Sequence, residues 1–593
     1  MNKLVTKSDV KKAIKLKGFF GNIAASFLMW ILGLNKLNKK YSKISQFEGR
    51  DFTTAVMREF GFGYELDDRQ LKNIPQEGPF ILVSNFPYGS IEGIILLHIV
   101  SAVRPEIKFL GNFMLSIIAN LRDYIFPINP FVDHPEFHNS FSGLRQASET
   151  LVNGGCLGLF PAGEVSTFYG GIFIQDKEWQ ISIIKLIKNA GVPVIPVYCH
   201  GTNSRFFHWA GRIHPLLRTL RLPKELLNKR GKIVSVRIGK SISPSEISEY
   251  KDLKSLGAYL KARTYALEAN IITAPKVEAR ALTPIALPNN RKHLQKEINA
   301  LPQNCFLFST GNYVCYLADY KLIPMMMHEL GRRREESFRA VGEGTGKPLD
   351  LDEYDEYYKH LILWDKHRQS LVGAYRLGFG KNIIEQRGIK GLYSNSLFGY
   401  EKPFQDVLKQ SIELGRSFVT LDYQKDALPL MLLIKGLLYS VLSHPEVKYL
   451  IGPVSISSWY PKFYRSVMIY YIQNKHSIKN FDDYVVPRNP FFPDYLRVKI
   501  DDLMKNKMES IEQFDRFLLR LSNNEYRLPT LVKKYLKINS KIIKFNVDPD
   551  FNYCVDGLVL LDLTQISKQE IINLSKDEPD KDKVYKRFGI EKN

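Results

Sequence analysis

The chain has 593 residues, more than one hydrophobic core usually serves, so we expect two or more domains. Hydrophobic residues make up 45% and charged residues 24%, which excludes an intrinsically disordered chain; five cysteines without CxxC or metal-ligand spacing argue against a disulfide framework and a metal site. A formal net charge of +22 favours acidic partners or anionic surfaces, and without a zinc-finger or RNP-like pattern we expect no nucleic-acid partner.

The first 45 residues are predicted to be a membrane-anchor segment. An apolar run at 18–34 has lysines on both sides. Its 17 residues are fewer than the roughly 20 of a membrane-spanning helix, and lysines suit the anionic cytoplasmic leaflet. We expect a peripheral or monotopic protein at the cytoplasmic face of the inner membrane, with spanning and interfacial placement both open. A buried core helix is the alternative, and the lack of a cleavage site argues against a signal peptide.

Residues 46–270 alternate strand-like and helix-like stretches, which predicts an α/β layer fold. Short apolar runs predict buried strands at 80–84, 156–160 and 192–198, and apolar positions at helical spacing predict a helix at 179–188. This region therefore forms the first of two expected α/β domains.

The second domain is expected at 294–575, after a proline-rich linker at 271–293. Strand candidates lie at 371–376 and 417–421. The last residues, 576–593, are rich in charge and are predicted to be a frayed tail.

Two blocks in the first domain place polar residues in turns after predicted strands. They read Ser84-Asn-Phe-Pro-Tyr-Gly-Ser-Ile-Glu-Gly93 and Leu159-Phe-Pro-Ala-Gly-Glu-Val-Ser166. They resemble the two main blocks of the glycerophosphate/lysophosphatidate acyltransferase superfamily, and 191–197 resembles a weaker third block in the same order. The resemblance implies a lysophospholipid-acyltransferase-like fold. It also implies a His base oriented by an Asp, and a second block that binds the acceptor's polar head.

The chain departs from that family at the base. Phe86 stands where the family has its catalytic His, and Glu92 stands where the orienting Asp is expected, one position further along. Losing a positioned base typically lowers the rate by about 10²–10⁴-fold, so we expect impaired O-acylation or a domain that only binds. Other candidates for the base are Glu92, Tyr88, His98 and His200. The resemblance assigns substrate binding to Asn85, Gly163, Glu164 and Ser166.

A second acyl-transfer pattern runs through the later domain. In chain order it contains Arg334-x-x-x-Phe338, Gly342-Glu343-Gly-Thr-Gly346, Asp350-x-Asp352-x-x-Asp355, Val372-Gly-Ala-Tyr-Arg376 and Glu413-x-x-Arg416. This order resembles the acyl-homoserine-lactone synthases and, more closely, the ornithine-lipid and glycine-lipid N-acyltransferases, which have a GNAT-like fold. Together, the two patterns resemble bifunctional aminolipid synthases over nearly the whole chain after residue 45.

An amine nucleophile must lose a proton, so a nearby carboxylate is useful as base or electrostatic partner. The candidates are Glu343, Asp352, Asp355 and Glu413. We predict Glu413 as the base and the two aspartates as the grip on the amine. Guanidinium groups suit a carboxylate or phosphate, which makes Arg334, Arg376 and Arg416 binding candidates. The glycines at 342–346 suggest a phosphate-cradling loop, and a salt-bridged surface is the alternative for the acidic residues.

The resemblance implies a two-step lipid acyltransferase without a bound cofactor. The C-terminal domain would N-acylate an amino acid or related amine with a 3-hydroxyacyl chain from acyl carrier protein or acyl-CoA. The N-terminal domain would then esterify that hydroxyl. The implied partners are acyl carrier protein, an anionic membrane surface and an amino acid or lyso-lipid acceptor. Two rival hypotheses are a lysophospholipid acyltransferase with an accessory domain and a catalytically dead lipid- or carrier-binding scaffold.

Overall fold

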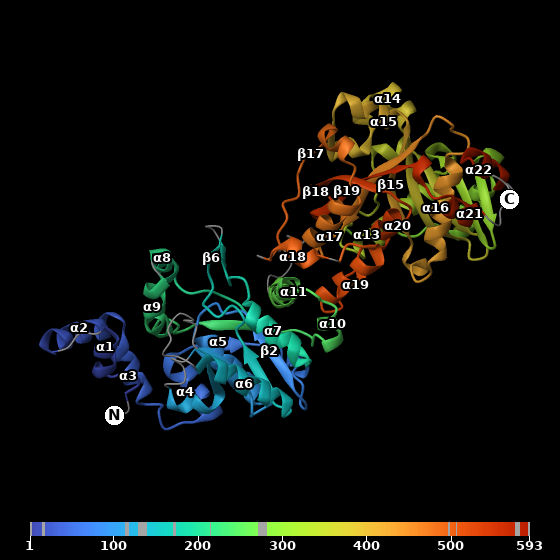
Figure 1. Ribbon diagram of the computed structural model, residues 1–593. Helices are drawn as coiled ribbons and strands as arrows, with labels where there is room; N and C mark the ends of the chain where they lie inside the picture. Colours follow the sequence, from blue (N-terminus) through green and yellow to red (C-terminus); the bar gives the residue numbers. More distant parts are fainter. Residues whose placement is uncertain are drawn as a thin grey trace. The chain divides into compact units, whose positions relative to one another are not determined.

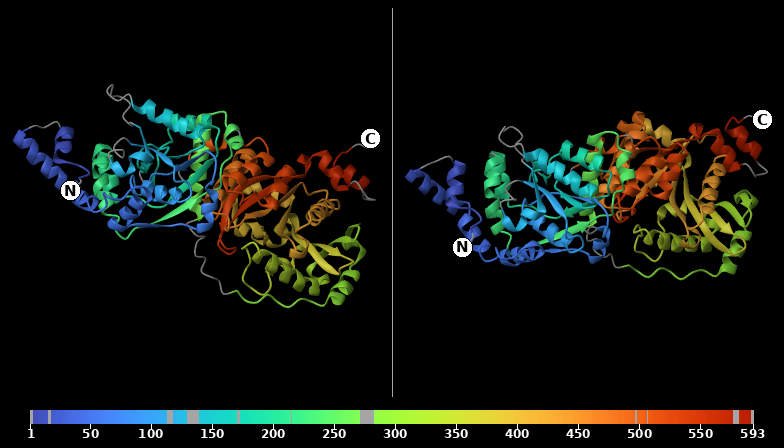
Figure 2. Two further views of the ribbon diagram at one scale, coloured as in Figure 1. Left: turned by 90° about the horizontal axis from the view of Figure 1, so that it is seen from below. Right: turned by 60° about the horizontal axis from the view of Figure 1, so that its bottom comes forward.

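The computed structural model describes residues 3–14, 18–112, 118–128, 139–169, 173–213, 215–270, 282–495, 498–505, 507–575 and 581–590. The chain divides into two compact units, each built around one main β-sheet with packed helices (Figures 1 and 2). The first unit comprises Met1–Ile272, Tyr495–Lys505 and Arg520–Glu525. The second unit comprises Thr273–Asp494, Asn506–Leu519 and Tyr526–Asn593.

The sheet of the first unit has parallel strands at its centre. Its strands in spatial order are β1 (Gly63–Glu65), β9 (Ile233–Ile238), β8 (Val194–Cys199), β2 (Phe80–Ser84), β5 (Cys156–Leu159), β3 (Lys108–Asn112) and β4 (Ile125–Ile128). β2 pairs in parallel with both β5 and β8, and all three are buried along their length. A sheet covered on both faces needs such continuous apolar strands, so the three predicted strands are confirmed with ends shifted by up to two residues.

The first unit also contains helices, several of which pack against this sheet. They are α1 (Lys7–Ile14), α2 (Gly18–Ile31), α3 (Leu34–Tyr41), α4 (Gly49–Phe60), α5 (Ile91–Ser101), α6 (Asn139–Val152), α7 (Ile181–Ala190), α8 (Arg205–Ile213), α9 (Pro215–Leu227), α10 (Pro244–Ser248), α11 (Leu253–Tyr265) and α18 (Ile500–Met504). Phe80 and Leu82 of β2 share one core with α4 and α5. The predicted helix at 179–188 is α7, and a small hairpin of β6 (Thr167–Tyr169) and β7 (Phe173–Gln175) follows the second sequence block.

The apolar run near the N-terminus is split between two helices. α2 ends at Ile31, and Gly33, with φ of 74°, turns the chain into α3. Within the described residues no single helix has the length and apolar character to cross a membrane. Taken together, α2 and α3 have that length and apolar character, but they are bent by 71° relative to each other. Leu34, Leu37 and Tyr41 of α3 join the core of the first unit.

The second unit contains a mostly antiparallel sheet. Its strands in spatial order are β10 (Phe306–Thr310), β11 (Tyr313–Asp319), β12 (Lys359–Asp365), β13 (Ser370–Phe379), β15 (Ser411–Val419), β16 (Tyr449–Ile456), β19 (Cys554–Asp562) and β18 (Lys541–Asp548). β15 and β16, the fifth and sixth strands in this order, are parallel and are joined only from Ser411↔Tyr449 to Glu413↔Ile451. Beyond that point β15 stays paired with β13 and β16 with β19, so the two strands part.

The other elements of this part of the chain complete the layers around that sheet. They are α12 (Arg291–Asn299), α13 (Pro324–Arg339), α14 (Gly380–Arg387), α15 (Lys402–Lys409), α16 (Leu428–Ser440), α17 (Lys462–Lys475), α19 (Ile511–Leu521), α20 (Thr530–Lys537), α21 (Lys568–Ser575), α22 (Lys581–Arg587) and the pair β14 (Phe398–Tyr400) and β17 (Val485–Pro487). The predicted linker lies partly at 271–281, outside the described residues, and 282–290 has no helix or strand. The tail at 576–593 was predicted to be frayed; this is wrong for α22, where Val584 is buried.

The strand prediction for the later domain is half right. The candidate at 371–376 lies within β13, as predicted. The candidate at 417–421 was placed too late, because β15 begins at Ser411 and contains both Glu413 and Arg416. These charged residues interrupt the apolar pattern that marks a buried strand, and their partners lie far away in the sequence.

Candidate active sites

The first site forms where β2 ends. Asn85 fastens this end to β8: its side-chain Nδ2 donates to the carbonyl oxygen of Cys199 (2.9 Å), and its Oδ1 accepts from the Cys199 N–H (2.7 Å). The side chain thus copies the backbone pairing of a β-ladder where the chain leaves the sheet. Asn85 sets the direction of the following loop.

Glu92 holds the turn that follows. It lies fully buried in the first turn of α5, and its carboxylate oxygens accept hydrogen bonds from the backbone N–H groups of Tyr88 (2.8 Å), Gly89 (2.7 Å) and Ser90 (2.9 Å). Burial raises the pKa of Glu92 above its ordinary value, although these hydrogen bonds act in the opposite direction. Such a carboxylate stabilises the helix N-terminus and the loop.

Phe86 joins the two sequence blocks. Its ring centroid lies 4.5 Å from that of Phe160, and its carbonyl oxygen accepts from the N–H of Ser166 (2.9 Å). Its own N–H donates to the carboxylate of Asp176 (3.2 Å), which also accepts from the Ser166 hydroxyl (2.6 Å). The titratable group that contacts position 86 is therefore Asp176, a fully buried residue in a stretch without any motif.

The other candidate bases have different partners. The Tyr88 hydroxyl donates to the carbonyl oxygen of His200 (3.0 Å), and burial raises its pKa further above its ordinary value. His98 lies in the last turn of α5, where its Nδ1 is 3.1 Å from the hydroxyl of Thr53. The imidazole of His200 is 3.9 Å from Glu268. None of these contacts involves Phe86.

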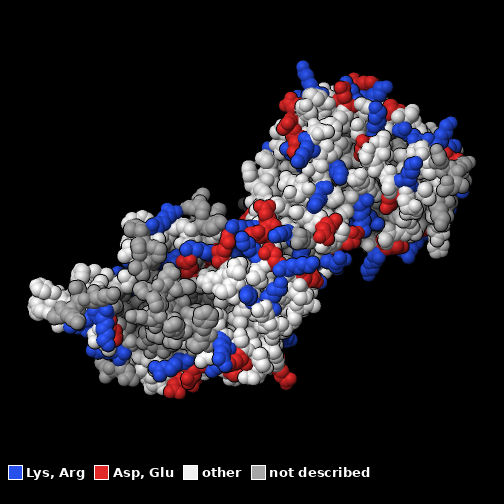
Figure 3. Space-filling model, viewed as in Figure 1, with Lys and Arg blue, Asp and Glu red and all other residues white. Residues whose placement is uncertain are grey.

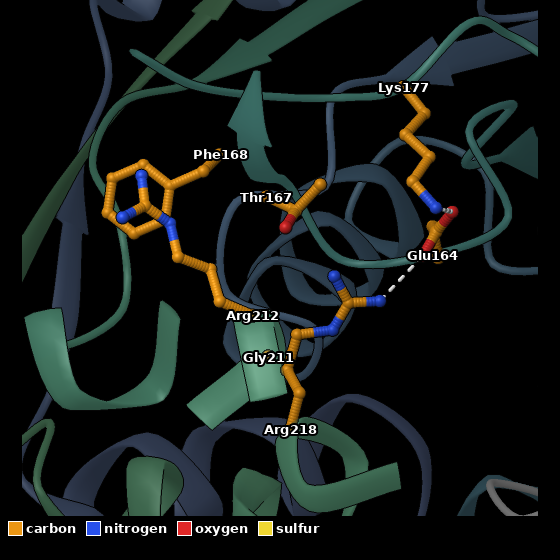
Figure 4. Close-up of a pocket in the computed structure, with 7 residues that line it drawn as sticks. All are labelled: Glu164, Thr167, Phe168, Lys177, Gly211, Arg212 and Arg218. Atoms are coloured by element: carbon orange, nitrogen blue, oxygen red, sulfur yellow. Dashed lines mark hydrogen bonds and ion pairs between the residues drawn. The ribbon is translucent and has the colours of Figure 1, made fainter. Parts of the chain in front are cut away.

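A cavity of about 350 Å³ opens beside the second block (Figure 4). It is lined by Glu164, Thr167, Phe168, Lys177, Gly211, Arg212 and Arg218. Glu164 is bridged by Lys177 (2.7 Å) and Arg218 (2.6 Å), while the guanidinium of Arg212 lies 4.2 Å from the Phe168 ring centroid. Burial alone would raise the pKa of Glu164, but the hydrogen bonds from Lys177 and Arg218 outweigh it and lower the pKa. Three cations against one carboxylate favour an anionic ligand.

Gly163 shapes the wall of this cavity. Its φ of 69° is left-handed, and its N–H donates to the carbonyl oxygen of Phe160 (2.9 Å). A Cβ atom at this position would lie 2.0 Å from Nε2 of Gln180. Glycine is therefore required by the turn itself, independently of any ligand.

In the second unit, the predicted arginines and aspartates form one chain of ion pairs, which is buried except at Asp352, whose side chain is 26% exposed. Asp355 accepts from Arg334 (2.7 Å) and lies 3.3 Å from Arg376. Asp352 accepts from Arg376 and lies 3.1 Å from Arg416, which is also 3.0 Å from Asp350. Burial alone would raise the pKa of Asp355, but the neighbouring guanidiniums of Arg334 and Arg376 outweigh it and lower the pKa well below its ordinary value.

Glu413 belongs to a separate set of contacts. It is 2% exposed, and its carboxylate accepts from the Tyr358 hydroxyl and from the N–H groups of Tyr393 (2.9 Å) and Ser394 (2.7 Å). Its position on β15 is the last one paired with β16. Glu413 therefore anchors the 393–394 backbone at the point where the two strands part.

Glu343 contacts β16, the other strand that borders the opening where β15 and β16 part. Among the described residues, the one side chain that donates to its carboxylate is Ser455 of β16, 112 positions away in the sequence (2.7 Å). Ser455 pairs with Asp556 of β19, and Asp548 of β18 pairs with Cys554, so Ser455, Asp548 and Asp556 lie on one face of the sheet.

These three acidic residues share a buried environment. Burial and the carboxylate of Asp548 raise the pKa of Glu343 to about 7. Burial and the charges of Asp548 and Glu343 raise the pKa of Asp556 well above its ordinary value. Sequence reasoning missed Asp548 and Asp556, because no motif of the sequence analysis contains them. Strongly shifted carboxylates beside an opening in a sheet are typical of catalytic sites.

Arg416 connects the two halves of this site. Its φ of 48° is left-handed, within a strand whose register against β13 shifts at this point. The guanidinium lies 5.1 Å from the Tyr393 ring centroid and 4.6 Å from that of Phe551, which is in the β18–β19 connection. Left-handed conformation in a residue other than glycine costs free energy, and such strain is found most often at functional sites.

The predicted phosphate-cradling loop at 342–346 is wrong. The N–H groups of Thr345 and Gly346 donate to the buried carboxylate of Glu335 (3.0 and 2.8 Å). Gly342 has φ of 77°, and a Cβ there would lie 2.4 Å from the Trp459 ring. The glycines allow the loop to pass close to the end of β16, which brings Glu343 to Ser455.

Comparison with known proteins separates the same two regions. A family described as acyltransferase matches residues 9–274, and an acetyltransferase (GNAT) domain matches residues 333–434. The fold prediction is therefore confirmed: an acyltransferase-type α/β domain precedes a GNAT-type α/β domain.

Curated relatives fall into two kinds. The glycine N(alpha)-acyltransferase of Phocaeicola vulgatus is 30% identical over 289 residues, which are 45% of this chain and 85% of the relative. The glycine N(alpha)-acyltransferase of Bacteroides thetaiotaomicron is 30% identical over 256 residues, which are 41% of this chain and 74% of the relative. The lyso-glycine lipid O-acyltransferase of Bacteroides thetaiotaomicron is 26% identical over 272 residues, which are 44% of this chain and 97% of the relative. In that organism the two names belong to separate proteins.

Proposed function

Because the chain belongs to the family of the glycine N(alpha)-acyltransferases, we propose that it is an acyltransferase of aminolipid synthesis. In this proposal the second unit joins a 3-hydroxyacyl chain to the amine of glycine or a related amino acid. The observation that carries the assignment is the acidic group of Glu343, Asp548 and Asp556 beside the opening between β15 and β16.

The proposed reaction is an aminolysis. The amine attacks the thioester carbonyl of the donor and loses a proton, the C–N bond forms, and the C–S bond breaks to release the thiol. We assign the proton to Glu343, because a base with a pKa near 7 is ionised to a useful degree at neutral pH and still holds a proton well. The sequence favoured Glu413, but three hydrogen bonds occupy its oxygens.

Asp548 and Asp556 are proposed to receive the ammonium form of the acceptor, and one of these two carboxylates takes its first proton to leave the free amine that attacks. Burying like charges together is unfavourable. The charge of Arg416 offsets part of this repulsion, and an ammonium relieves it further. The chain of ion pairs is proposed to hold this site in shape, since its charges are mostly paired with one another. Its members are Arg334, Arg376, Arg416, Asp352 and Asp355.

The donor is proposed to be acyl carrier protein or acyl-CoA, at the cytoplasmic face of the inner membrane. A net charge of +22 favours an acidic carrier and an anionic membrane alike. On the face shown in Figure 3, basic and acidic side chains of the described residues are interspersed. The net positive charge of the whole protein therefore explains attraction of an acidic partner better than a single basic patch on that face does.

For the first unit we propose a lyso-lipid acceptor site with a weakened O-acylation step. An N-acyl amino acid carries a free carboxylate, and Lys177, Arg212 and Arg218 offer it a cationic cavity beside Ser166. The base is missing, because position 86 presents a phenyl ring packed on Phe160.

Lipid mass spectrometry of a bacterial host that expresses the full chain tests this division of labour. We expect monoacyl aminolipid from the wild type and diacyl aminolipid from Phe86→His, since the imidazole restores a base worth about 10²–10⁴-fold in rate. Phe86→Leu is the matched control and should leave the monoacyl product unchanged. Diacyl product from the wild type would contradict the loss of the base. Label in lysophosphatidate, or carrier binding without any product, would support the lysophospholipid acyltransferase or the scaffold instead.

A further inference from the structure

Helices α8 and α9 of the first unit form a hairpin (Figure 1). Apolar side chains lie both on its buried side and on its exposed side. On α8, Phe207 and Ala210 are buried against the unit. Phe206 and Trp209, three residues apart on the opposite face, are 52% and 54% exposed. A surface helix of a soluble protein normally turns a polar face outward, so this outer face requires a partner.

α9 continues the exposed face. Leu217 and Leu220, again three residues apart, are 42% and 48% exposed. The guanidinium of Arg221 lies 4.1 Å from the Phe206 ring centroid, and the Phe206 and Trp209 rings are 5.7 Å apart. These contacts join the two helices into one outer surface, the α8–α9 face: Phe206, Trp209, Leu217 and Leu220.

The charges carried by the two helices are almost all positive. The basic residues of the two helices are Arg205, Arg212, Arg218, Arg221 and Lys224. Their acidic residue is Glu225, which is buried and accepts hydrogen bonds from Ser204. Trp, Phe and Leu surrounded by Arg and Lys are typical of helices that lie in the headgroup region of an anionic membrane.

We propose that the α8–α9 face rests on an anionic lipid bilayer. The aromatic rings and leucines enter the boundary between headgroups and acyl chains, while the long basic side chains extend to the phosphates. An acidic protein partner would be held by the cations alone and would leave these four apolar side chains without a reason for their exposure. This face is separate from α2, where the membrane-anchor segment was predicted.

The same hairpin also lines the cavity. Arg212 lies in the last turn of α8, with its guanidinium over Phe168, and Arg218 of α9 pairs with Glu164 (Figure 4). A hairpin with its outer face in the headgroup layer thus holds the cationic cavity near the headgroups, where an anionic lipid can enter. This last step rests on the proposed function of the first unit, whereas the docking itself does not.

Vesicle flotation of the full chain tests the docking without any turnover. The test variant is Phe206→Ser with Trp209→Ser, two exposed positions whose replacement leaves the core intact. The control is Phe492→Ser, which removes an aromatic ring that is 71% exposed in the second unit. We expect about tenfold weaker partition of the test variant into phosphatidylglycerol vesicles, and unchanged partition of the control. Equal partition of both variants would overturn the proposal.

Brominated lipids locate the face directly, because they quench tryptophans that enter the acyl region. Trp209→Phe keeps the apolar ring and removes one of the five tryptophans. We expect it to lower the quenching, and Trp459→Phe to leave the quenching unchanged. Equal quenching in the wild type and in Trp209→Phe would overturn the proposal. So would a double serine variant that keeps vesicle binding and loses binding to acyl carrier protein, since the face would then dock the carrier.

Discussion

Replacing Glu343 by Gln is expected to lower kcat for N-acylation by about 10²–10⁴-fold, the usual contribution of a positioned base. In the wild type kcat/KM should rise with pH and level off above about 7, because burial and Asp548 raise the pKa of Glu343 to about 7 and only the ionised form accepts a proton. This rise should be missing in Glu343→Gln. A pH–rate profile of purified full-length protein with an acyl-carrier donor measures both effects.

The same variant should be more stable than the wild type. The pKa of Glu343 rises from 4.5 to about 7 on folding, so the folded state binds the proton more tightly than the unfolded chain. Ionisation therefore removes stability as pH rises from about 4.5 to 7, by about 3 kcal/mol when complete. Glu343→Gln avoids this cost, and its free energy of unfolding at pH 8 should exceed that of the wild type by up to that amount.

Glu413→Gln is the matched control for the base. A carboxamide has one acceptor oxygen, whereas Tyr393 and Ser394 each donate an N–H to a carboxylate oxygen of Glu413. We expect lower thermal stability with the rise of activity near pH 7 preserved, because the base is intact. If Glu413→Gln instead abolished that rise and Glu343→Gln preserved it, the base would be Glu413, as the sequence favoured.

Asp355→Ala is expected to destabilise the second unit by about 3–5 kcal/mol. Asp355 lies between Arg334 and Arg376, and the exposed fractions of all three side chains are 2% or less. Removing the carboxylate leaves two buried guanidiniums close together without their shared counter-ion, and breaking a buried pair in this way costs about that much. Urea unfolding at pH 7, followed by tryptophan fluorescence, measures the change.

The effect of Asp355 should depend on pH. Because the pKa of Asp355 is lowered on folding, its stabilisation is complete above its unfolded pKa of about 3.8 and is lost as pH falls toward the folded value. The difference between wild type and variant should therefore shrink below pH 4. Asp406→Ala removes a carboxylate that is 78% exposed in an ion pair with Lys409, and should change stability by less than about 1 kcal/mol. Equal effects of the two variants would contradict the role of the buried chain.

Several elements were predictable from the sequence because their signals are local. β2, β5 and β8 are short apolar runs, and continuous apolar character is what a strand with two covered faces requires. The order of the polar blocks likewise indicated an acyltransferase-type domain followed by a GNAT-type domain, which the comparisons confirm.

The sites needed long-range contacts. Glu343 meets Ser455 across 112 positions, and Asp176 meets Phe86 across 90. The sequence indicated Glu413 and Arg416 as a pair. It did not indicate that both lie within a strand, or that Glu413 holds the backbone at 393–394. A hydrogen bond between distant segments leaves no periodic trace in either segment, so residue type and spacing give no ranking among the carboxylates.

By itself the sequence determined the two α/β domains, their order and the missing imidazole at position 86, because apolar periodicity and residue identity are properties of single segments. Only the tertiary structure decided which carboxylates are engaged by hydrogen bonds and ion pairs within the fold and which can act on a substrate. Burial, counter-charges and hydrogen-bond donors come from strands brought together by folding, and these set the pKa of Glu343 near 7 while they commit Glu92, Glu413 and Asp355 to holding the fold.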